Sequence, residues 1–336
     1  MKIKRISKKI KILLAALMCI ATLFSFSGCN NGQRLYIGFF ANLTHAPALV
    51  SAMNKDMENA FGADTKIGRF VFNAGPALME ALRSGKLDVG YIGPVPAING
   101  YLSTNGAIKI IAGVTAAGCM LVTAKNSNIS DIASLDGKTV AIPQFNNTQD
   151  ILLRQILAEN GLSPTSLGGT VEIIQQDNAS IEMLLNDNSI DAALLPEPWG
   201  SRLVENGVAL VLLDSNDILD GNYTVAVIVA RTDYINKNRD ILVELLKEHI
   251  NIINNFDEDE LNKVNATIEQ ITGVGLEKEI LLESYGRINL DYDINEQSLQ
   301  MFADTCYALG ITDTKIDISN VIDSSILEDA LLNVED

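Results

Sequence analysis

Histidine, cysteine and tryptophan are scarce in this chain of 336 residues, which has two histidines, four cysteines and one tryptophan. Two of the cysteines fall within the first 29 residues, which leaves Cys119 and Cys306. With only His45 and His249 beside them, no Cys/His zinc cluster can be assembled. We therefore predict no metal and no cofactor. Two buried free thiols are the favoured state of these cysteines, and a disulfide is the alternative.

Positive charge is also in short supply. The chain has 25 lysines and arginines against 42 acidic residues, a net charge of −17. Six of the basic residues and none of the acidic ones lie in the first 28 positions, so the remainder carries −23. Nucleic acid and anionic lipid repel a body of this charge. We expect no nucleic-acid partner.

Long apolar runs are missing as well. The longest, residues 12–26, is shorter than the roughly 20 residues that a membrane-spanning helix needs, and it follows a basic segment. That order is typical of a secretory signal. The run ends in Phe26-Ser27-Gly28-Cys29, which resembles a lipobox. We predict a lipoprotein signal peptide over 1–28, lipidation of Cys29, and a short tether over 29–33. An ordinary signal cleaved elsewhere is the alternative.

Strand and helix patterns alternate up to about residue 230, which predicts an α/β fold with parallel sheets. The later part of the chain is almost wholly helical in pattern. Strands are expected at 35–40, 65–72, 87–92, 108–114, 120–124, 139–142, 171–174, 190–195, 210–213 and 224–230. Helices are expected at 46–58, 76–84, 94–101, 148–160, 181–186, 199–205, 240–255, 260–271, 276–285 and 296–309.

A weak internal repeat indicates two similar lobes. The strand-to-helix junction at 40–45 recurs at 144–149, an offset of 104 residues. The helix, turn and strand at 82–94 recur at 185–199, an offset of about 103. About 300 residues exceed the usual single core, so two lobes agree with the length. Because ligands of open α/β sheets bind beyond the carboxyl ends of strands, these junctions predict a ligand cleft between facing lobes.

Polar residues cluster where two of the expected helices begin. Asn and Thr are favoured helix caps, so capping alone explains each cluster without any ligand. The functional interpretation is that hydroxyl, amide and imidazole donors meet an anion beside free backbone N–H groups. The residues concerned are Asn42, Thr44, His45, Asn147, Thr148 and Gln149.

Glycine and proline mark the other candidate positions. Gly75 and Gly93, the latter followed by Pro94, enter helices and would let a ligand approach the backbone, although tight turns explain them equally well. Glu197 lies between two prolines and precedes Trp199. This glutamate could accept a hydrogen bond from a ligand, pair with Arg202 five residues on, or help the lobes meet. The tryptophan could stack on an apolar part of a ligand or pack the edge of its lobe.

The same segments carry a family resemblance over nearly the whole chain. They are 42–50, 72–77, 91–100, 143–150 and 196–199. Together they resemble the substrate-binding proteins of ABC transporters for aliphatic sulfonates, nitrate and taurine. The resemblance implies a type II periplasmic-binding-protein fold, with one lobe over 34–119 plus 223–336 and the other over 120–222. Crossing segments are implied at 118–121 and 222–225.

The resemblance also implies a function. It implies a protein that binds a small organic anion, with a transporter permease and its ATPase as partners. Together with the predicted signal peptide and Cys29, it leads us to expect an exported, lipid-anchored monomer. Nitrate, bicarbonate and thiamine-pyrimidine precursors are alternative ligands within the superfamily. A pyrimidine-synthesising enzyme shares the fold but uses a cysteine-rich iron site, for which this chain lacks the cysteines. We expect binding without catalysis.

Overall fold

A computed structural model describes residues 33–61 and 65–332. The predicted signal peptide, the anchor Cys29 and most of the tether lie outside these residues. In the part of the chain described, no helix is long and apolar enough to cross a membrane.

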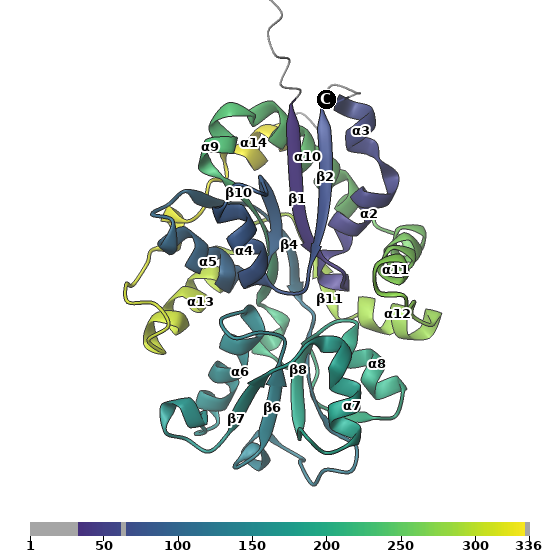
Figure 1. The fold of residues 1–336 in the computed structure, drawn as a ribbon, viewed down its shortest axis with the longest axis vertical. Coiled ribbons are helices and arrows are strands. Elements are labelled where there is room, and N and C mark those ends of the chain that lie inside the picture. Colours follow the sequence, from purple (N-terminus) through teal and green to yellow (C-terminus); the bar gives the residue numbers. More distant parts are fainter. Residues whose placement is uncertain (1–32, 62–64, 333–336) are drawn as a thin grey trace, which may run out of the picture.

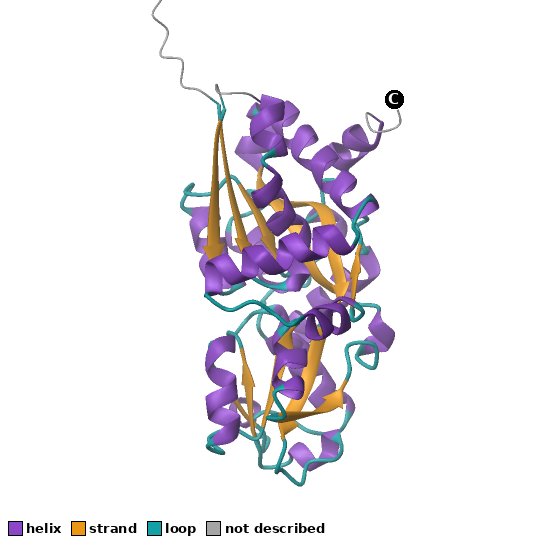
Figure 2. Cartoon of the chain, turned by 90° about the vertical axis from the view of Figure 1, so that its right-hand side faces the viewer, coloured by secondary structure: helices purple, strands orange, loops and turns teal. Residues whose placement is uncertain are grey.

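Two mixed sheets form two lobes, one above the other in Figure 1. The first lobe is built on six strands and the second on five, and Figure 2 shows the lobes stacked along the long axis of the molecule. In spatial order the first sheet has β11 (Ile288–Leu290), β4 (Ile108–Ala117), β10 (Thr224–Arg231), β3 (Val89–Ile92), β1 (Arg34–Phe40) and β2 (Lys66–Phe72). The second has β7 (Glu172–Gln175), β6 (Thr139–Ile142), β8 (Ala192–Pro196), β5 (Cys119–Ala124) and β9 (Ala209–Leu213).

The two sheets have the same strand order. The sequence β2-β1-β3-β10-β4 in the first corresponds to β7-β6-β8-β5-β9 in the second. The chain passes between the lobes before β5 and again before β10. Each of these strands lies antiparallel to both of its neighbours in its sheet. The internal repeat falls on the equivalent pairs β1/β6 and β3/β8, so the prediction of two lobes of similar construction is confirmed.

Helices cover the sheets of both lobes. In the first lobe α4, α5 and α13 lie together, and α2, α10, α11 and α14 form a second group. First-lobe helices are α2 (Ala46–Asn54), α3 (Asp56–Phe61), α4 (Gly75–Arg83), α5 (Pro94–Ser103), α9 (Thr232–Lys237), α10 (Arg239–Asn254), α11 (Glu258–Thr272), α12 (Lys278–Tyr285), α13 (Glu296–Ala308) and α14 (Ser325–Leu332). Those of the second lobe are α6 (Thr148–Glu159), α7 (Ile181–Asn186) and α8 (Trp199–Glu205).

The apolar core continues from one lobe into the other. One cluster of buried side chains includes Leu78 and Ile98 of the first lobe and Leu152 and Leu153 of the second. Contacts of α6 with α5 and α13 close this side of the boundary. The conformation is therefore one in which the lobes touch.

Every expected strand and helix is present, with small differences at the ends. The helix expected over 46–58 is instead two, because Lys55 adopts a left-handed conformation with φ 59° and ends α2. The sequence pattern does not predict β11, α9 and α14, which lie in the part expected to be helical. Cys119 and Cys306 are buried free thiols, as the favoured prediction had it.

Candidate functional site

Strand-to-helix junctions from both lobes surround a small inner cavity. Its volume is about 30 Å³, room for a compact group of a few heavy atoms. The lining residues are Phe40, Asn42, Thr44, His45, Asn73, Ala74, Gly75, Gly93, Pro96, Pro143, Asn147, Thr148, Gln149, Asn178, Pro196 and Val225. Eight of the eleven predicted ligand-binding residues are among them. The structure thus brings together the junctions that the repeat singled out.

The start of α6 presents an unpartnered hydroxyl to this cavity. Asn147 caps the helix, since its side chain accepts a hydrogen bond from the Asp150 N–H at 2.9 Å. Thr148 is therefore not the cap. Its Oγ1 is buried and has no hydrogen-bond partner among the described residues. Because an unpaired buried hydroxyl costs free energy, this atom points to a missing partner.

Gly93 faces Thr148 from the other lobe. A Cβ added to this glycine would lie 2.2 Å from Thr148 Oγ1. The φ of Gly93 is −67°, so the backbone itself does not require glycine. What requires glycine here is the close approach of the two lobes at the cavity wall.

The turn before α2 supplies a second group of neutral donors. Thr44 Oγ1 donates to Asn42 Oδ1 at 2.9 Å, and Asn42 makes no side-chain cap. The Phe40 N–H donates to His45 Nδ1 at 3.4 Å, which leaves the proton on Nε2. Burial lowers the pKa of His45 to about 3, so the imidazole is neutral. Side-chain capping therefore explains only part of the polar cluster at 147–149, and it explains none of the polar cluster at 42–45.

Within residues 33–61 and 65–332, no lysine, arginine, aspartate or glutamate lines the inner cavity. Its polar groups are amides, hydroxyls and one neutral imidazole, joined by the first N–H groups of the surrounding helices. Asn73 and Asn178 belong to this set and were not predicted. Asn73 directly follows β2, and Asn178 lies shortly after the end of β7. Their position at strand ends was the signal in the sequence by which these two site residues could have been found.

A larger outer cavity adjoins the inner one. It has a volume of about 480 Å³ and shares Phe40, Asn42, Asn73, Pro143 and Asn178 with it. Most of its other walls are apolar: Val71, Phe72, Trp199, Leu203, Ile271 and Val274. Asp177, Glu182 and Arg202 also reach it. The Arg202 guanidinium lies 5.9 Å from the centre of the Trp199 ring.

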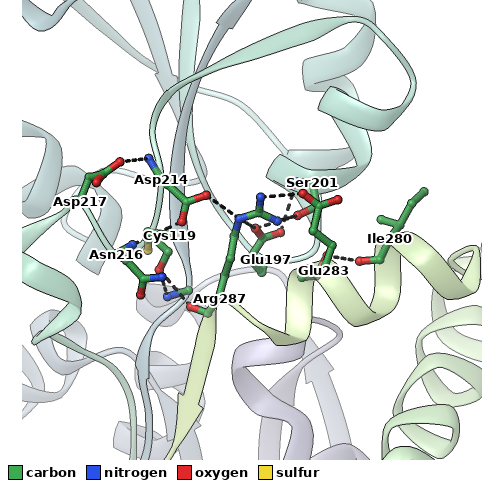
Figure 3. A network of polar contacts seen from close by, with 12 residues as sticks. Cys119, Glu197, Ser201, Asp214, Asn216, Asp217, Ile280, Glu283 and Arg287 are labelled. Atoms are coloured by element: carbon green, nitrogen blue, oxygen red, sulfur yellow. Dashed lines mark hydrogen bonds and ion pairs between the residues drawn. The ribbon is translucent and has the colours of Figure 1, made fainter.

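Pro94 and Glu197 are the predicted site residues that line neither cavity. The Glu197 carboxylate accepts hydrogen bonds from Ser201 N–H at 3.2 Å and Ser201 Oγ at 2.9 Å. Arg287 Nε of the first lobe lies 3.8 Å from it (Figure 3). Of the three roles considered for this side chain, its contacts fit a part in the meeting of the lobes. The suggested partner Arg202 is replaced by Arg287.

Burial changes the acidity of Glu197. The side chain is fully buried, and this raises its pKa to about 7 despite the hydrogen bonds from Ser201 and the nearby Arg287, which lower it.

Among the residues described, no group of three or more His, Cys, Asp or Glu side chains is placed to hold a metal ion.

Comparison with known proteins agrees with this architecture. A family model described as the NMT1-like family matches residues 29–269. A protein of Escherichia coli (strain K12) named "Putative aliphatic sulfonates-binding protein" is 28% identical over 232 residues, 68% of either chain. The "Taurine-binding periplasmic protein" of the same organism is 27% identical over 205 residues, 61% of either chain.

Solved structures show the same fold. The alkanesulfonate-binding protein SsuA from Xanthomonas axonopodis pv. citri, bound to MOPS, superposes with a TM-score of 0.74 at 20% identity, covering 86% of this chain and 98% of that one. The periplasmic nitrate-binding protein NrtA from Synechocystis PCC 6803 gives 0.72 at 18% identity, covering 91% and 90%. The chain belongs to the NMT1-like family and has the fold of the periplasmic binding proteins.

Proposed function

We propose that this protein is the extracytoplasmic solute-binding component of an ABC importer, and that it binds a small organic anion of the aliphatic sulfonate type between its lobes. The observation that carries the proposal is the Thr148 hydroxyl, which is buried in a cavity walled by both lobes and has no partner in the described part of the chain. The names of the relatives, which refer to sulfonates, taurine and nitrate, support the ligand class.

The anionic head would occupy the inner cavity. Its oxygens would accept hydrogen bonds from Thr148 Oγ1, His45 Nε2, the amides of Asn42 and Asn73, and backbone N–H groups at helix starts. Each bond to a charged acceptor contributes about 1.5–3 kcal/mol, and a helix end adds a few tenths to about 2. Four or five such contacts offset desolvation and ordering well enough for micromolar affinity, about −8 kcal/mol.

The carbon tail would extend into the outer cavity. Phe40, Trp199, Ile271 and Val274 offer it an apolar surface. Every methylene that is fully buried adds about 0.8 kcal/mol, roughly fourfold in affinity. This cavity favours a sulfonate with a tail over nitrate or bicarbonate, which would leave the apolar walls wet. A taurine-like ligand would place its distal ammonium in the outer cavity, which Asp177 and Glu182 also line.

The remaining parts of the proposal come from the sequence and the family. We infer export, anchoring through a lipid on Cys29, transfer of the ligand to a permease driven by an ATPase, and a monomeric binding protein without catalytic activity. Mass spectrometry of the protein from membranes would test the anchor, since a diacylglycerol on Cys29 gives a defined mass increase. Consumption of a ligand in a closed assay would contradict binding alone.

Isothermal titration calorimetry tests the ligand class. Methane-, butane- and hexanesulfonate, taurine, nitrate and a thiamine-pyrimidine precursor are titrated separately, with hexanol as the uncharged control. We expect affinity to rise along the sulfonate series and hexanol to give no heat. Tight binding of the pyrimidine together with no heat from any sulfonate would overturn the proposal.

A further inference from the structure

A polar network around Arg287 spans the boundary between the lobes (Figure 3). Arg287 lies between α12 and β11, both of the first lobe. Its Nε contacts Asp214 Oδ2 at 2.7 Å, and its Nη1 donates to Ser201 Oγ at 2.9 Å. Asp214 directly follows β9 and Ser201 lies on α8, both of the second lobe. One first-lobe cation therefore holds two elements of the other lobe.

The same arginine is fixed by contacts with Glu283 of its own lobe and with Ser215 of the second lobe. Its Nη2 contacts Glu283 Oε1 of α12 at 2.7 Å, and only 14% of its side chain is exposed. Its carbonyl oxygen accepts a hydrogen bond from Ser215 Oγ at 3.0 Å. The Gly118 N–H, at the passage from β4 to β5, donates to the same Ser215 hydroxyl. The guanidinium is thus oriented beside a passage of the chain between lobes, not free on the surface.

Glu197 connects this network to the inner cavity. Its carboxylate faces Arg287 and is held by Ser201. Its carbonyl oxygen accepts a hydrogen bond from the Leu43 N–H at 3.1 Å, across the lobe boundary. Leu43 lies in the turn between Asn42 and His45, two of the residues that line the cavity. A single residue of the second lobe therefore touches both Arg287 and the turn that carries the donors.

We propose that Arg287 is a positioning residue for ligand binding: it locks the lobes in the closed arrangement and, through Glu197, holds the 42–45 turn in register with Thr148. The inference rests on the proposed function, because it names a residue that acts on the same site. Arg287 itself lines neither cavity.

The chemistry of the network explains the need for arginine. Its planar fork donates from fixed directions to Asp214, Ser201 and Glu283 at once, which the single ammonium of lysine cannot do. When the lobes separate, Glu197 and Asp214 lose their shared cation. Ligand affinity then depends on the closed fraction, because the apparent dissociation constant is the intrinsic one divided by that fraction.

The test compares Arg287→Gln and Arg287→Lys with Arg83→Gln. Arg83 is an exposed arginine whose ion pair, with Glu80, lies within its own helix α4. Interlobe distances are measured by pulsed electron spin resonance between labels on Ser103→Cys and Lys125→Cys, two positions exposed on the first and second lobes. Each protein is measured alone and with hexanesulfonate, and hexanesulfonate affinity and thermal unfolding are recorded in parallel.

We expect Arg287→Gln to move the distance distribution toward longer distances and to weaken hexanesulfonate binding about tenfold or more. Arg287→Lys should give a partial effect, and Arg83→Gln none. Unchanged distances with only a lower unfolding temperature would overturn the inference and leave Arg287 a structural residue. If hexanesulfonate binds none of the proteins, the proposed ligand is wrong, and the ligand-free distances still decide the role of Arg287.

Discussion

Replacing Thr148 with valine tests the inner cavity directly. Valine keeps the size and branching of threonine, so the wall shared with Gly93 keeps its shape. Only the buried Oγ1, which has no partner in the described part of the chain, is exchanged for a methyl group. The substitution therefore separates a hydrogen bond to the ligand from packing.

The structure predicts opposite effects on stability and on binding. An unsatisfied buried hydroxyl carries a desolvation penalty of about 1–3 kcal/mol, so the ligand-free variant should be as stable as the wild type or more so. In the complex the lost bond to an anion is about 1.5–3 kcal/mol, which corresponds to an affinity loss of roughly 10- to 150-fold.

Calorimetry with hexanesulfonate and urea unfolding without ligand measure the two effects. Thr104→Val is the matched control, because Thr104 Oγ1 is paired with the Gly100 carbonyl at the far end of α5. It should lower stability slightly and leave the affinity unchanged. If Thr148→Val binds hexanesulfonate as tightly as the wild type while its free energy of unfolding falls, Thr148 Oγ1 is not a ligand donor.

Three more predictions concern neighbouring residues. Gly93→Ala should weaken binding, because its Cβ would lie 2.2 Å from Thr148 Oγ1; equal affinity by calorimetry would show that the wall yields. Trp199 is the only tryptophan, so hexanesulfonate should shift its fluorescence more than methanesulfonate does, and equal responses would argue against a tail in the outer cavity. Burial raises the pKa of Glu197 to about 7, so this group has no effect on stability below the pKa of the unfolded chain, and stability is lost as the pH rises from that value to about 7. The unfolding free energy of the wild type minus that of Glu197→Gln should thus fall by about 3 kcal/mol between pH 4.5 and 8, and a flat difference would place the pKa elsewhere.

Local sequence patterns predicted most of the elements, because the strands of this fold are short apolar runs ended by turn residues. The repeat located the site for a related reason. Ligand groups of an open sheet gather where strands end, so similar lobes repeat those junctions. β11 was not predicted because its three residues carry too little periodicity, and the strand forms by pairing with β4.

The roles of individual polar residues could not be predicted from the sequence. Asn42 and Asn147 occupy equivalent junctions, yet only Asn147 caps its helix. The partner of Glu197 lies 90 positions away at Arg287, and a separation of that size leaves no local signal. Charge alone suggested Arg202, whose side chain instead lies over Trp199. Tertiary contacts decide these cases.

The position of the sulfur atom in a crystal of the hexanesulfonate complex tests the central claim most directly. Two sites compete for the anion: the neutral donors of the inner cavity, and Arg202 in the outer one. Anomalous scattering distinguishes them. We predict a sulfur peak in the inner cavity, with sulfonate oxygens within hydrogen-bond distance of Thr148 Oγ1 and His45 Nε2. A peak beside Arg202, with the tail in the inner cavity, would contradict the account.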